Sequence, residues 1–334
     1  MKIAVLGAGA WGTALAIAWA KRDPAHQVSL WSRDEGHAES MRQTHENALL
    51  AGIVLPESIR PEEDFSRAVQ DIALAVVATP VVGLRPTVQA LCKYATGVPM
   101  IWVCKGFEAG SGLLPHQVVE AELKQAGQSA VPCGTLTGPS FALEVARQQP
   151  TAVTFAARDA AWAEQIAREL HTARLRVYAH DDLVGAEVGG AVKNVLAIAT
   201  GICDGLGLGF NARAALMTRG LAEIARLGLA LGGRQETFMG LAGAGDLVLT
   251  CTGDLSRNRK VGLALAEGKA LPQILTDLGH VAEGVSTARE VAGLAVKHKV
   301  DMPIAAMVSA VLDGRFDART AVEQLLARSP KSEF

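Results

Sequence analysis

The chain has 334 residues, 49% of them hydrophobic and only 4% aromatic, and its formal net charge is −2 at pH 7. This length accommodates about two domains of ordinary size. The balanced charge, without any cluster of Lys/Arg and aromatic residues, argues against a nucleic-acid-binding groove.

The N-terminus, "KIAVLGAGAWGTALA", predicts a strand over 2–7 that leads directly into a helix. Gly7, Gly9 and Gly12 form G-x-G-x-x-G between the two elements. In that setting the glycines allow a tight turn, close approach of a pyrophosphate and close packing of helix on strand, which predicts dinucleotide binding. A ligand-free glycine turn is the alternative. A secretory signal peptide is a second alternative, but the apolar segment of a signal peptide does not require three glycines.

The second predicted strand, 27–31, ends in "SLWSRD", where an acidic residue accepts the ribose hydroxyls in NAD-binding proteins. Arg33 occupies this region and favours the 2′-phosphate of NADP. Asp34, one residue later, leaves NAD open as a second cofactor. The alternative interpretation of Arg33 is a solvated loop arginine without a ligand.

Further β-branched apolar runs alternate with helical patterns up to about residue 180. Continuous hydrophobicity is typical of strands covered on both faces, so we predict an α/β, Rossmann-type doubly wound parallel sheet. After Asp181 and Asp182 the pattern becomes helical. The clearest helix is 211–233, with Asn211 as its cap and Gly232-Gly233 at its end. We therefore predict a dinucleotide-binding domain over 1–182 and an all-α C-terminal domain over 183–334. The later strand runs are 72–79, 99–104, 133–138, 151–157 and 175–179.

The five cysteines are far apart and lack C-x-x-C or Cys/His ligand spacing, so we expect no metal site and a reducing, cytoplasmic environment. No uninterrupted apolar run reaches the ~18 residues of a membrane-spanning helix, so no stable membrane insertion is expected.

Polar residues also follow two strands of the predicted sheet. Lys105 ends the strand in "WVCKGFE", and a turn at Gly138-Pro139-Ser140 ends the strand in "LTGPSFALE". Ligands of open α/β sheets bind at the carboxyl ends of strands, which makes these residues substrate-site candidates. A surface lysine is the alternative for Lys105.

In the helical part, "EVGGAVKNVLAIATGICDG" places Lys193 and Asn194 in an apolar run. Burying an ammonium group costs several kcal/mol unless a partner compensates it. Asp246 follows a glycine-rich loop that we expect to be flexible, and Thr250 lies four residues later, on the same helical face.

"SRNR" places Ser256, Arg257 and Asn258 at a helix start, where N–H groups and a guanidinium form an anion site. The alternatives to these site roles are that Asp246 and Ser256 only cap helices and that Arg257 lies on a solvated face.

Taken together, the motifs resemble bacterial NAD(P)-dependent sn-glycerol-3-phosphate dehydrogenase. The matching blocks occur in that family's order from residue 5 to about 290. They are "GAGAWGTALA", "CKGFE", "GPSFALEVA", "GGAVKNVLAIATG", "GLAGAGDLVLTCTGDLSRNR" and "VAEGVSTA".

The resemblance implies the roles of individual residues. Lys193 is the expected acid/base, with Lys105 and Asp246 as further catalytic residues. The expected substrate contacts are Lys105, Gly138, Ser140, Lys193, Asn194, Asp246, Thr250, Ser256, Arg257 and Asn258. The expected cofactor contacts are Gly7, Gly9, Ala10, Trp11, Gly12, Arg33, Lys105, Ala142, Arg257, Val281 and Glu283.

The implied reaction interconverts dihydroxyacetone phosphate and sn-glycerol 3-phosphate with NADP or NAD, at a cleft between the domains, and supplies phospholipid synthesis. Another two-domain dehydrogenase acting on a different hydroxy acid or ketone, and a non-catalytic NADPH sensor, remain as rival interpretations. The oligomeric state stays open, with a homodimer among the possibilities.

Overall fold

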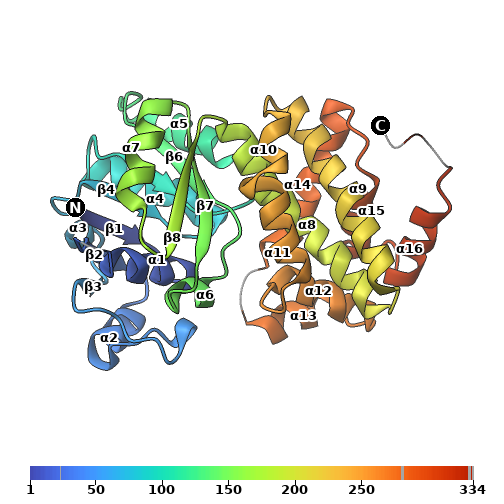
Figure 1. The fold of residues 1–334 in the computed structure, drawn as a ribbon, viewed down its shortest axis with the longest axis horizontal. Coiled ribbons are helices and arrows are strands. Elements are labelled where there is room, and N and C mark those ends of the chain that lie inside the picture. The colour runs from blue at the N-terminus through green and yellow to red at the C-terminus, as the bar shows by residue number, and fades with distance from the viewer. Residues whose placement is uncertain (23, 280–281, 330–331, 333–334) are drawn as a thin grey trace. The chain divides into compact units, whose positions relative to one another are not determined.

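The computed structural model describes residues 1–22, 24–279, 282–329 and 332. Its contacts divide the chain into two units, coloured blue to green and green to red in Figure 1. Unit 1 comprises 1–108 and 113–187, and unit 2 comprises 109–112 and 188–334. The division at residues 182 and 183 stays a prediction.

Unit 1 contains an eight-stranded sheet in the order β3-β2-β1-β4-β5-β6-β7-β8. Neighbouring strands are parallel except for the antiparallel pair β6 and β7. The chain order reverses beside β1, which is the arrangement of a dinucleotide-binding sheet. The strands are β1 (Lys2–Leu6), β2 (Gln27–Trp31), β3 (Ile59–Glu62), β4 (Leu74–Val77), β5 (Met100–Trp102), β6 (Cys133–Thr137), β7 (Thr151–Ala157) and β8 (Leu175–His180).

Two features of this sheet differ from the prediction. Strand β3 was missed because "IRPE" has no apolar run, and its Pro61 is tolerated because β3 lies at the sheet edge. The prediction of a parallel sheet does not hold at β7, which pairs with β6 in the antiparallel direction. The connection before β7 holds only the five-residue α6 (Ala142–Ala146), and the chain turns back instead of crossing over to a parallel position.

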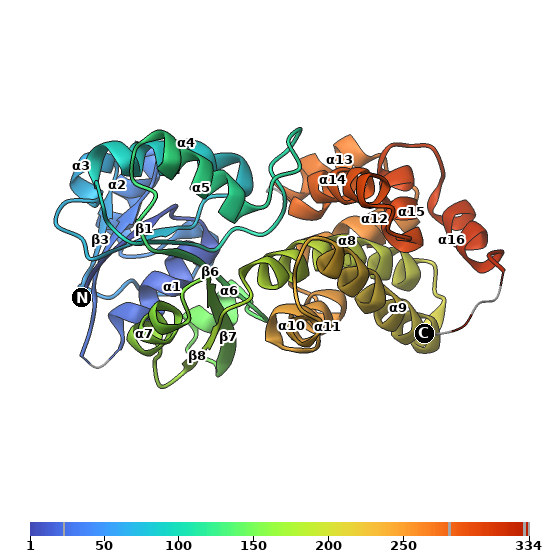
Figure 2. The same ribbon diagram turned by 90° about the horizontal axis from the view of Figure 1, so that it is seen from above.

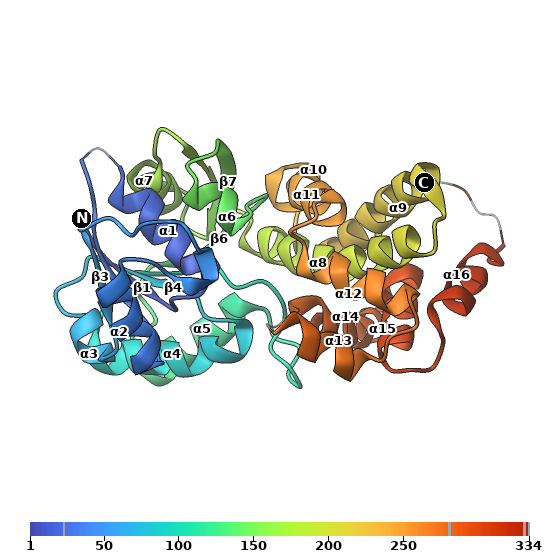
Figure 3. The same cartoon turned by 90° about the horizontal axis from the view of Figure 1, so that it is seen from below.

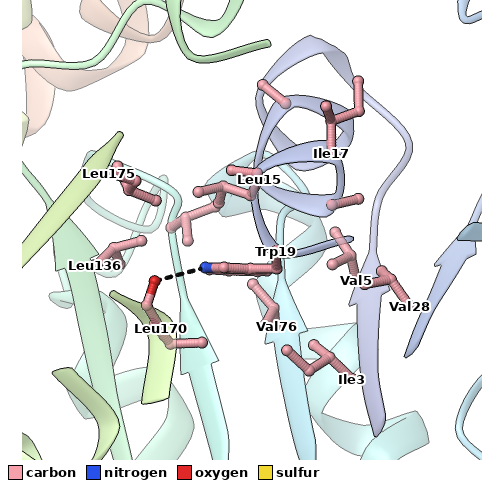
Figure 4. Packing of buried hydrophobic residues seen from close by; sticks show 14 of the residues in the cluster. Ile3, Val5, Leu15, Ile17, Trp19, Val28, Val76, Leu136, Leu170 and Leu175 are labelled. Atoms are coloured by element: carbon pink, nitrogen blue, oxygen red, sulfur yellow. Dashed lines mark hydrogen bonds between the residues drawn. The ribbon is translucent and has the colours of Figure 1, made fainter. Parts of the chain in front are cut away.

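Helices cover both faces of the sheet, with α3, α4 and α5 on one side and α1 and α7 on the other (Figure 2). Helix α1 is buried along most of its length, and the Trp19 indole donates a hydrogen bond to the Leu170 carbonyl oxygen at 3.1 Å (Figure 4). An all-round apolar helix is stable only when it is covered in this way. The remaining elements are α1 (Ala10–Ala20), α2 (Glu35–Thr44), the 3-10 turn η1 (Ala48–Leu50), α3 (Phe65–Ala68), α4 (Val81–Tyr94), α5 (Pro115–Gln125) and α7 (Ala160–Leu170).

Unit 2 is helical, in agreement with the predicted all-α C-terminal part. Its elements are α8 (Leu183–Gly205), which begins in unit 1, α9 (Gly209–Ala230), α10 (Gln235–Met239), the π-turn η2 (Leu241–Gly245), α11 (Asp246–Thr252), α12 (Arg257–Ala266), α13 (Leu271–Leu278), α14 (Glu283–His298), α15 (Pro303–Leu312) and α16 (Ala318–Leu326). The predicted cap at Asn211 was wrong. Helix α9 begins at Gly209, so Asn211 lies inside its first turn, whereas Gly232 follows its end as expected.

Helix α8 is the central helix of this unit. By length and composition it could cross a bilayer, but 94% of its most apolar window is buried inside the protein. A wholly apolar helix that is buried in this way forms part of the core.

The backbones of α8 and α12 touch where two glycines face each other. A Cβ atom at Gly201 would lie 2.1 Å from the Arg259 carbonyl oxygen, and one at Gly262 would lie 2.1 Å from the Ile198 carbonyl oxygen. No larger residue fits either position. The position of α12 against α8 is therefore set by direct backbone contact.

Glu223 on α9 predicts a pH dependence of stability. It is 1% exposed and accepts hydrogen bonds from the N–H groups of Ile304 (2.7 Å) and Ala305 (3.0 Å), and burial raises its pKa from 4.5 to about 7. The folded protein therefore holds this proton more tightly than the unfolded chain, and the resulting stability, complete below the unfolded pKa, is lost as pH rises through 7.

Between pH 4 and pH 8, the free energy of unfolding of the parent is expected to fall by roughly 2 to 4 kcal/mol more than that of Glu223→Gln, because the glutamine amide does not titrate. Urea unfolding at the two pH values measures both. Equal losses in both proteins would contradict this assignment.

Candidate functional site

The three glycines after β1 each meet a different constraint. Gly7 has φ +126°, and a Cβ there would lie 2.8 Å from the Ala78 carbonyl, so the turn requires glycine. A Cβ at Gly12 would lie 2.1 Å from the Gly7 carbonyl oxygen, where α1 packs on the strand. Gly9 caps α1 without a side-chain bond, and a Cβ there would meet nothing within 4 Å. The loop thus fits a pyrophosphate approaching the N-terminus of α1, where Ala10 and Trp11 begin the helix.

Two buried hydroxyl groups lie near the carboxyl ends of strands in the same unit. The Oγ1 atoms of Thr79, two residues after β4, and Thr137, the last residue of β6, find no hydrogen-bond partner among the described residues. Buried polar atoms normally have one. Their position at the ligand-binding edge of the sheet is consistent with partners supplied by a bound ligand.

The segment after β2 has a defined shape. Asp34 caps α2 by accepting a hydrogen bond from the His37 N–H (3.0 Å), and Ser32 is buried beneath it. The Arg33 side chain is exposed and has no ion-pair partner in the described parts of the chain. Asp34 is thus engaged locally, whereas Arg33 is available to an anion.

Asn47 supports the glycine loop and was missed by the sequence analysis. It is fully buried, and its amide nitrogen donates to the Ala8 carbonyl oxygen (2.9 Å) and the Thr13 hydroxyl (2.7 Å). Its amide oxygen pairs with His37 Nε2 at 3.1 Å, and His37 Nδ1 pairs with the Ser32 hydroxyl at 3.3 Å. This network links the glycine loop to the segment that carries Arg33. No motif marks Asn47 in "THENALL", and only its contacts in the fold identify it.

At the carboxyl ends of β5 and β6, the structure brings three predicted substrate residues together. Lys105 Nζ donates to the Gly138 carbonyl oxygen (3.1 Å), and the Ser140 hydroxyl donates to the same oxygen (3.0 Å). Ala142 is the first residue of α6, directly after this turn. These residues form one polar patch within unit 1.

In unit 2, Lys193 is buried and paired. Its side chain is 7% exposed, and its ammonium group donates to the Asp246 carboxylate and, at 2.8 Å, to the Thr250 hydroxyl. The Thr250 hydroxyl donates in turn to the Asp246 carbonyl oxygen at 2.6 Å. Asp246 is 1% exposed. The charge of Lys193 is thus compensated inside the core, as the cost of burying an ammonium group requires.

The π-turn η2 leads into Asp246. Glycines permit the tight packing around this turn. A Cβ at Gly243, within "GLAGAG", would lie 2.1 Å from the Phe238 carbonyl oxygen, and one at Gly189, on the neighbouring α8, would lie 2.4 Å from the Ala242 carbonyl oxygen. The prediction of a flexible loop was therefore wrong. Asp246 is the first residue of α11 and is not its cap. π-turns of this kind are frequent at functional sites.

A chain of amide groups connects α8, α12 and α14. Asn258 Nδ2 donates to Asn194 Oδ1 (3.0 Å), and Asn258 Oδ1 accepts from the Gly284 N–H (3.0 Å). The Asn194 amide nitrogen has no partner within the described ranges and is available as a donor. Glu283 begins α14, and Val281 lies outside the described residues.

The N-terminus of α12 carries Ser256 and Arg257. Ser256 caps the helix by accepting a hydrogen bond from the Arg259 N–H (3.2 Å), which is the alternative that the sequence left open beside a site role. Arg259 is held to Asp204 at the end of α8 by two hydrogen bonds of 3.0 and 2.8 Å. The Arg257 side chain, in contrast, is exposed and forms no ion pair with any described residue. A fixed helix start thus presents an unpaired guanidinium.

Comparison with known proteins identifies the family to which this fold and these motifs belong. Residues 2–163 match the description "NAD-dependent glycerol-3-phosphate dehydrogenase N-terminus", and residues 182–323 match the C-terminus of the same family. The chain belongs to this family. A relative from Dechloromonas aromatica, named glycerol-3-phosphate dehydrogenase [NAD(P)+], is 65% identical over all of both chains, and one of the same name from Aromatoleum aromaticum is 58% identical, again over all of both chains.

A solved structure supports the same assignment. The crystal structure of glycerol-3-phosphate dehydrogenase from Coxiella burnetii has a TM-score of 0.91 and 40% sequence identity, and the match covers 98% of this chain and 99% of that one. The family resemblance, the fold class, the enzyme class and the NAD(P) cofactor predicted from sequence are confirmed. The roles of individual site residues remain predictions.

Proposed function

We propose that this chain interconverts dihydroxyacetone phosphate and sn-glycerol 3-phosphate with NAD(P)H. The observation that carries this proposal is the buried Lys193–Asp246 pair together with Arg257, which lies in the same helical unit and forms no ion pair with any described residue. A cofactor sensor has no use for a buried, compensated ammonium group. An enzyme for an unphosphorylated hydroxy acid has less use for a second cationic site at a helix start.

The glycine loop and Arg33 are the proposed cofactor residues of unit 1. Gly7, Gly9 and Gly12 let the backbone at Ala10 and Trp11 approach the pyrophosphate, and Arg33 pairs with a 2′-phosphate. Lys105, Ala142, Arg257, Val281 and Glu283 are further proposed contacts. When bound, the nicotinamide ring supplies a hydride to the C2 carbonyl carbon of the substrate.

Lys193 is the proposed general acid and base. Hydride addition to C2 leaves an alkoxide, which gains the proton that Lys193 Nζ donates, and the positive charge favours the alkoxide as it forms. In the reverse direction Lys193 removes the hydroxyl proton. Asp246 and Thr250 hold the ammonium group in place and compensate its charge before substrate binds.

The remaining predicted residues bind and orient the substrate in this proposal. Ser256, Arg257 and Asn258 hold the phosphate at the N-terminus of α12, where N–H groups and a guanidinium favour an anion. Asn194 offers its amide N–H to a substrate oxygen. Lys105, which we also propose as a catalytic residue, contributes a further cation, and Gly138 and Ser140 contribute polar contacts.

A direct assay tests the proposed reaction. Purified protein mixed with NADPH and dihydroxyacetone phosphate is expected to consume NADPH, followed as absorbance at 340 nm, and to form sn-glycerol 3-phosphate. Absence of turnover in a protein that binds NADPH would support the sensor instead. Faster turnover of an unphosphorylated ketone would support the other dehydrogenase.

Arg33→Asp is expected to reverse the cofactor preference from NADPH to NADH. A carboxylate repels the 2′-phosphate and accepts the ribose hydroxyls of NADH, and the measurement is kcat/KM for each cofactor. Arg168→Asp makes the same charge change on an exposed part of α7 and should leave both values unchanged. An unchanged kcat/KM for NADPH in Arg33→Asp would show that Arg33 does not read the 2′-phosphate.

We further propose that the chain supplies glycerol 3-phosphate for phospholipid synthesis in the cytoplasm. Its five free thiols are compatible with a reducing compartment. A homodimer is the proposed assembly, which light scattering on the purified chain tests.

A further inference from the structure

Three helices of unit 2, α8, α9 and α12, meet at Asp204 near the end of α8 (Figure 3). One oxygen of its carboxylate, Oδ2, accepts three hydrogen bonds. Arg213 on α9 donates one at 3.1 Å, and Arg259 in the first turn of α12 donates two, from Nε at 3.0 Å and from Nη2 at 2.8 Å. The Asp204 side chain is only 14% exposed. None of these three residues belongs to the predicted site.

Arg259 is fixed at three points. Its N–H group donates to the Ser256 hydroxyl, its carbonyl oxygen packs directly on the backbone of α8 at Gly201, and its guanidinium group binds Asp204. Two charge-assisted bonds to one carboxylate oxygen restrict a guanidinium group more closely than one bond does. The further contact of Arg259, to Asp254 at 3.1 Å, reaches a 96% exposed side chain, and an ion pair of this kind contributes little. Asp204 is therefore the partner that holds the Arg259 side chain.

The direction of Arg257 follows from this arrangement. Successive residues of an α-helix turn by about 100°, so Arg257 and Arg259 lie about 200° apart around α12. Because Arg259 faces α8, Arg257 faces away from α8, in agreement with its exposed side chain. Asn258, between them, is also held to α8, through Asn194 Oδ1 at 3.0 Å. The first turn of α12 is thus anchored on one side and presents Arg257 on the other.

We propose that Arg259, anchored by Asp204, is a positioning residue that fixes Arg257 for the substrate phosphate. The inference rests on the proposed function, in which the start of α12 binds that phosphate. Arg259 itself does not bind the phosphate, because its guanidinium group is turned to α8 and bonded to Asp204. It acts by holding the helix start, and with it Arg257, in place, since small displacements of a binding group weaken its contacts.

A purely electrostatic role is the alternative. Arg213 and Arg259 carry two positive charges against the single negative charge of Asp204, and this excess would attract a phosphate without any defined geometry. The two roles predict opposite effects of Asp204→Asn, which keeps the shape of the side chain and removes its charge. Weaker anchoring of Arg259 raises the KM for dihydroxyacetone phosphate, whereas a larger local positive charge lowers it.

Arg259→Lys separates position from charge, because lysine keeps the positive charge and loses the paired N–H donors. The KM for dihydroxyacetone phosphate is expected to rise roughly three- to tenfold, with kcat within about twofold of the parent, which is the pattern of a weakened binding contact. Asp204→Asn should raise this KM by roughly threefold, because a neutral acceptor holds a guanidinium group less firmly. Initial rates at saturating NADPH give both constants, and urea unfolding confirms that each variant is folded.

Arg289→Lys is the matched control. Arg289 pairs with Asp313 through Nε at 2.8 Å, in the same unit, but it is 59% exposed and lies on α14. The same substitution there should leave both constants unchanged.

A double variant shows whether Arg259 acts through Arg257. If it does, Arg259→Lys should raise the KM less in the Arg257→Gln protein than in the parent, since the group that it positions is already absent. Additive effects of the two substitutions, an unchanged KM in Arg259→Lys, or a lower KM in Asp204→Asn would each overturn the proposal.

If Arg259→Lys does not fold, the direction of the KM change in Asp204→Asn decides between the two roles. A parent protein without turnover of dihydroxyacetone phosphate would overturn this inference together with the proposed function. Normal turnover of the parent with an unchanged KM in Arg259→Lys would overturn this inference alone.

Discussion

Lys193→Met is expected to lower kcat by about 10²- to 10⁴-fold, the usual contribution of a general acid. The methionine keeps the length of the side chain but offers no proton to the alkoxide. The affinity for NADPH, measured by fluorescence titration, should stay close to that of the parent, because the glycine loop belongs to unit 1 and Lys193 to unit 2. A loss of kcat without a loss of NADPH affinity separates the chemical role from a general defect.

The buried Asp246 requires a control for folding. Removing the Lys193 ammonium group leaves the Asp246 carboxylate without that partner, and the loss of one member of a buried ion pair typically costs about 3 to 5 kcal/mol of stability. The double variant Lys193→Met/Asp246→Asn removes both charges, so it should regain stability and remain inactive. Lys297→Met removes a charge from an exposed position of α14 and should keep full activity. A folded Lys193→Met protein with turnover within tenfold of the parent would leave Lys105 as the next candidate acid.

Arg257→Gln is expected to raise the KM for dihydroxyacetone phosphate roughly ten- to a hundredfold. A charge-assisted hydrogen bond to a bound anion contributes about 1.5 to 3 kcal/mol, which corresponds to this range. The exposed Arg257 side chain has no ion-pair partner in the described residues, so its removal should cost little stability. Initial rates at saturating NADPH give the measurement.

Unphosphorylated dihydroxyacetone separates two possible partners of Arg257. If Arg257 binds the substrate phosphate, the variant should process the unphosphorylated ketone as well as the parent does. An equal loss with both ketones would instead assign Arg257 to a phosphate of the cofactor. Arg289→Gln, an exposed arginine on α14, is the control and should change neither KM.

The parts of this protein that follow from sequence are those with local causes. The positive φ of Gly7 and the close approach of Gly12 to the Gly7 carbonyl arise within one strand, turn and helix, so "GAGAWG" predicted the loop. Lys193 was recognisable because a charge in an apolar helix needs a partner wherever the helix lies. The capping role of Ser256 follows from a hydrogen bond to the N–H group three residues later.

Other features depend on contacts that no local pattern records. Asn47 is recognisable only once its stretch is folded against Ala8 and Thr13. Strand β3 pairs at a sheet edge and needs no apolar run, and the reversed direction of β7 is a property of the assembled sheet. The glycines before Asp246 are compatible with either a mobile loop or a close-packed turn, and only their neighbours on α8 and α10 decide between them.

The π-turn over Leu241–Gly245 also sets the rotational phase of α11. Each residue of a regular α-helix advances the side-chain direction by about 100°, and a π-turn accommodates one residue more than an α-turn does. Without that extra residue the stripe formed by Asp246 and Thr250 would point about 100° away from Lys193, with the amino-acid composition of the site almost unchanged. The electrostatic partner of Lys193 is thus selected by the winding of the backbone as well as by the identity of the residue at 246.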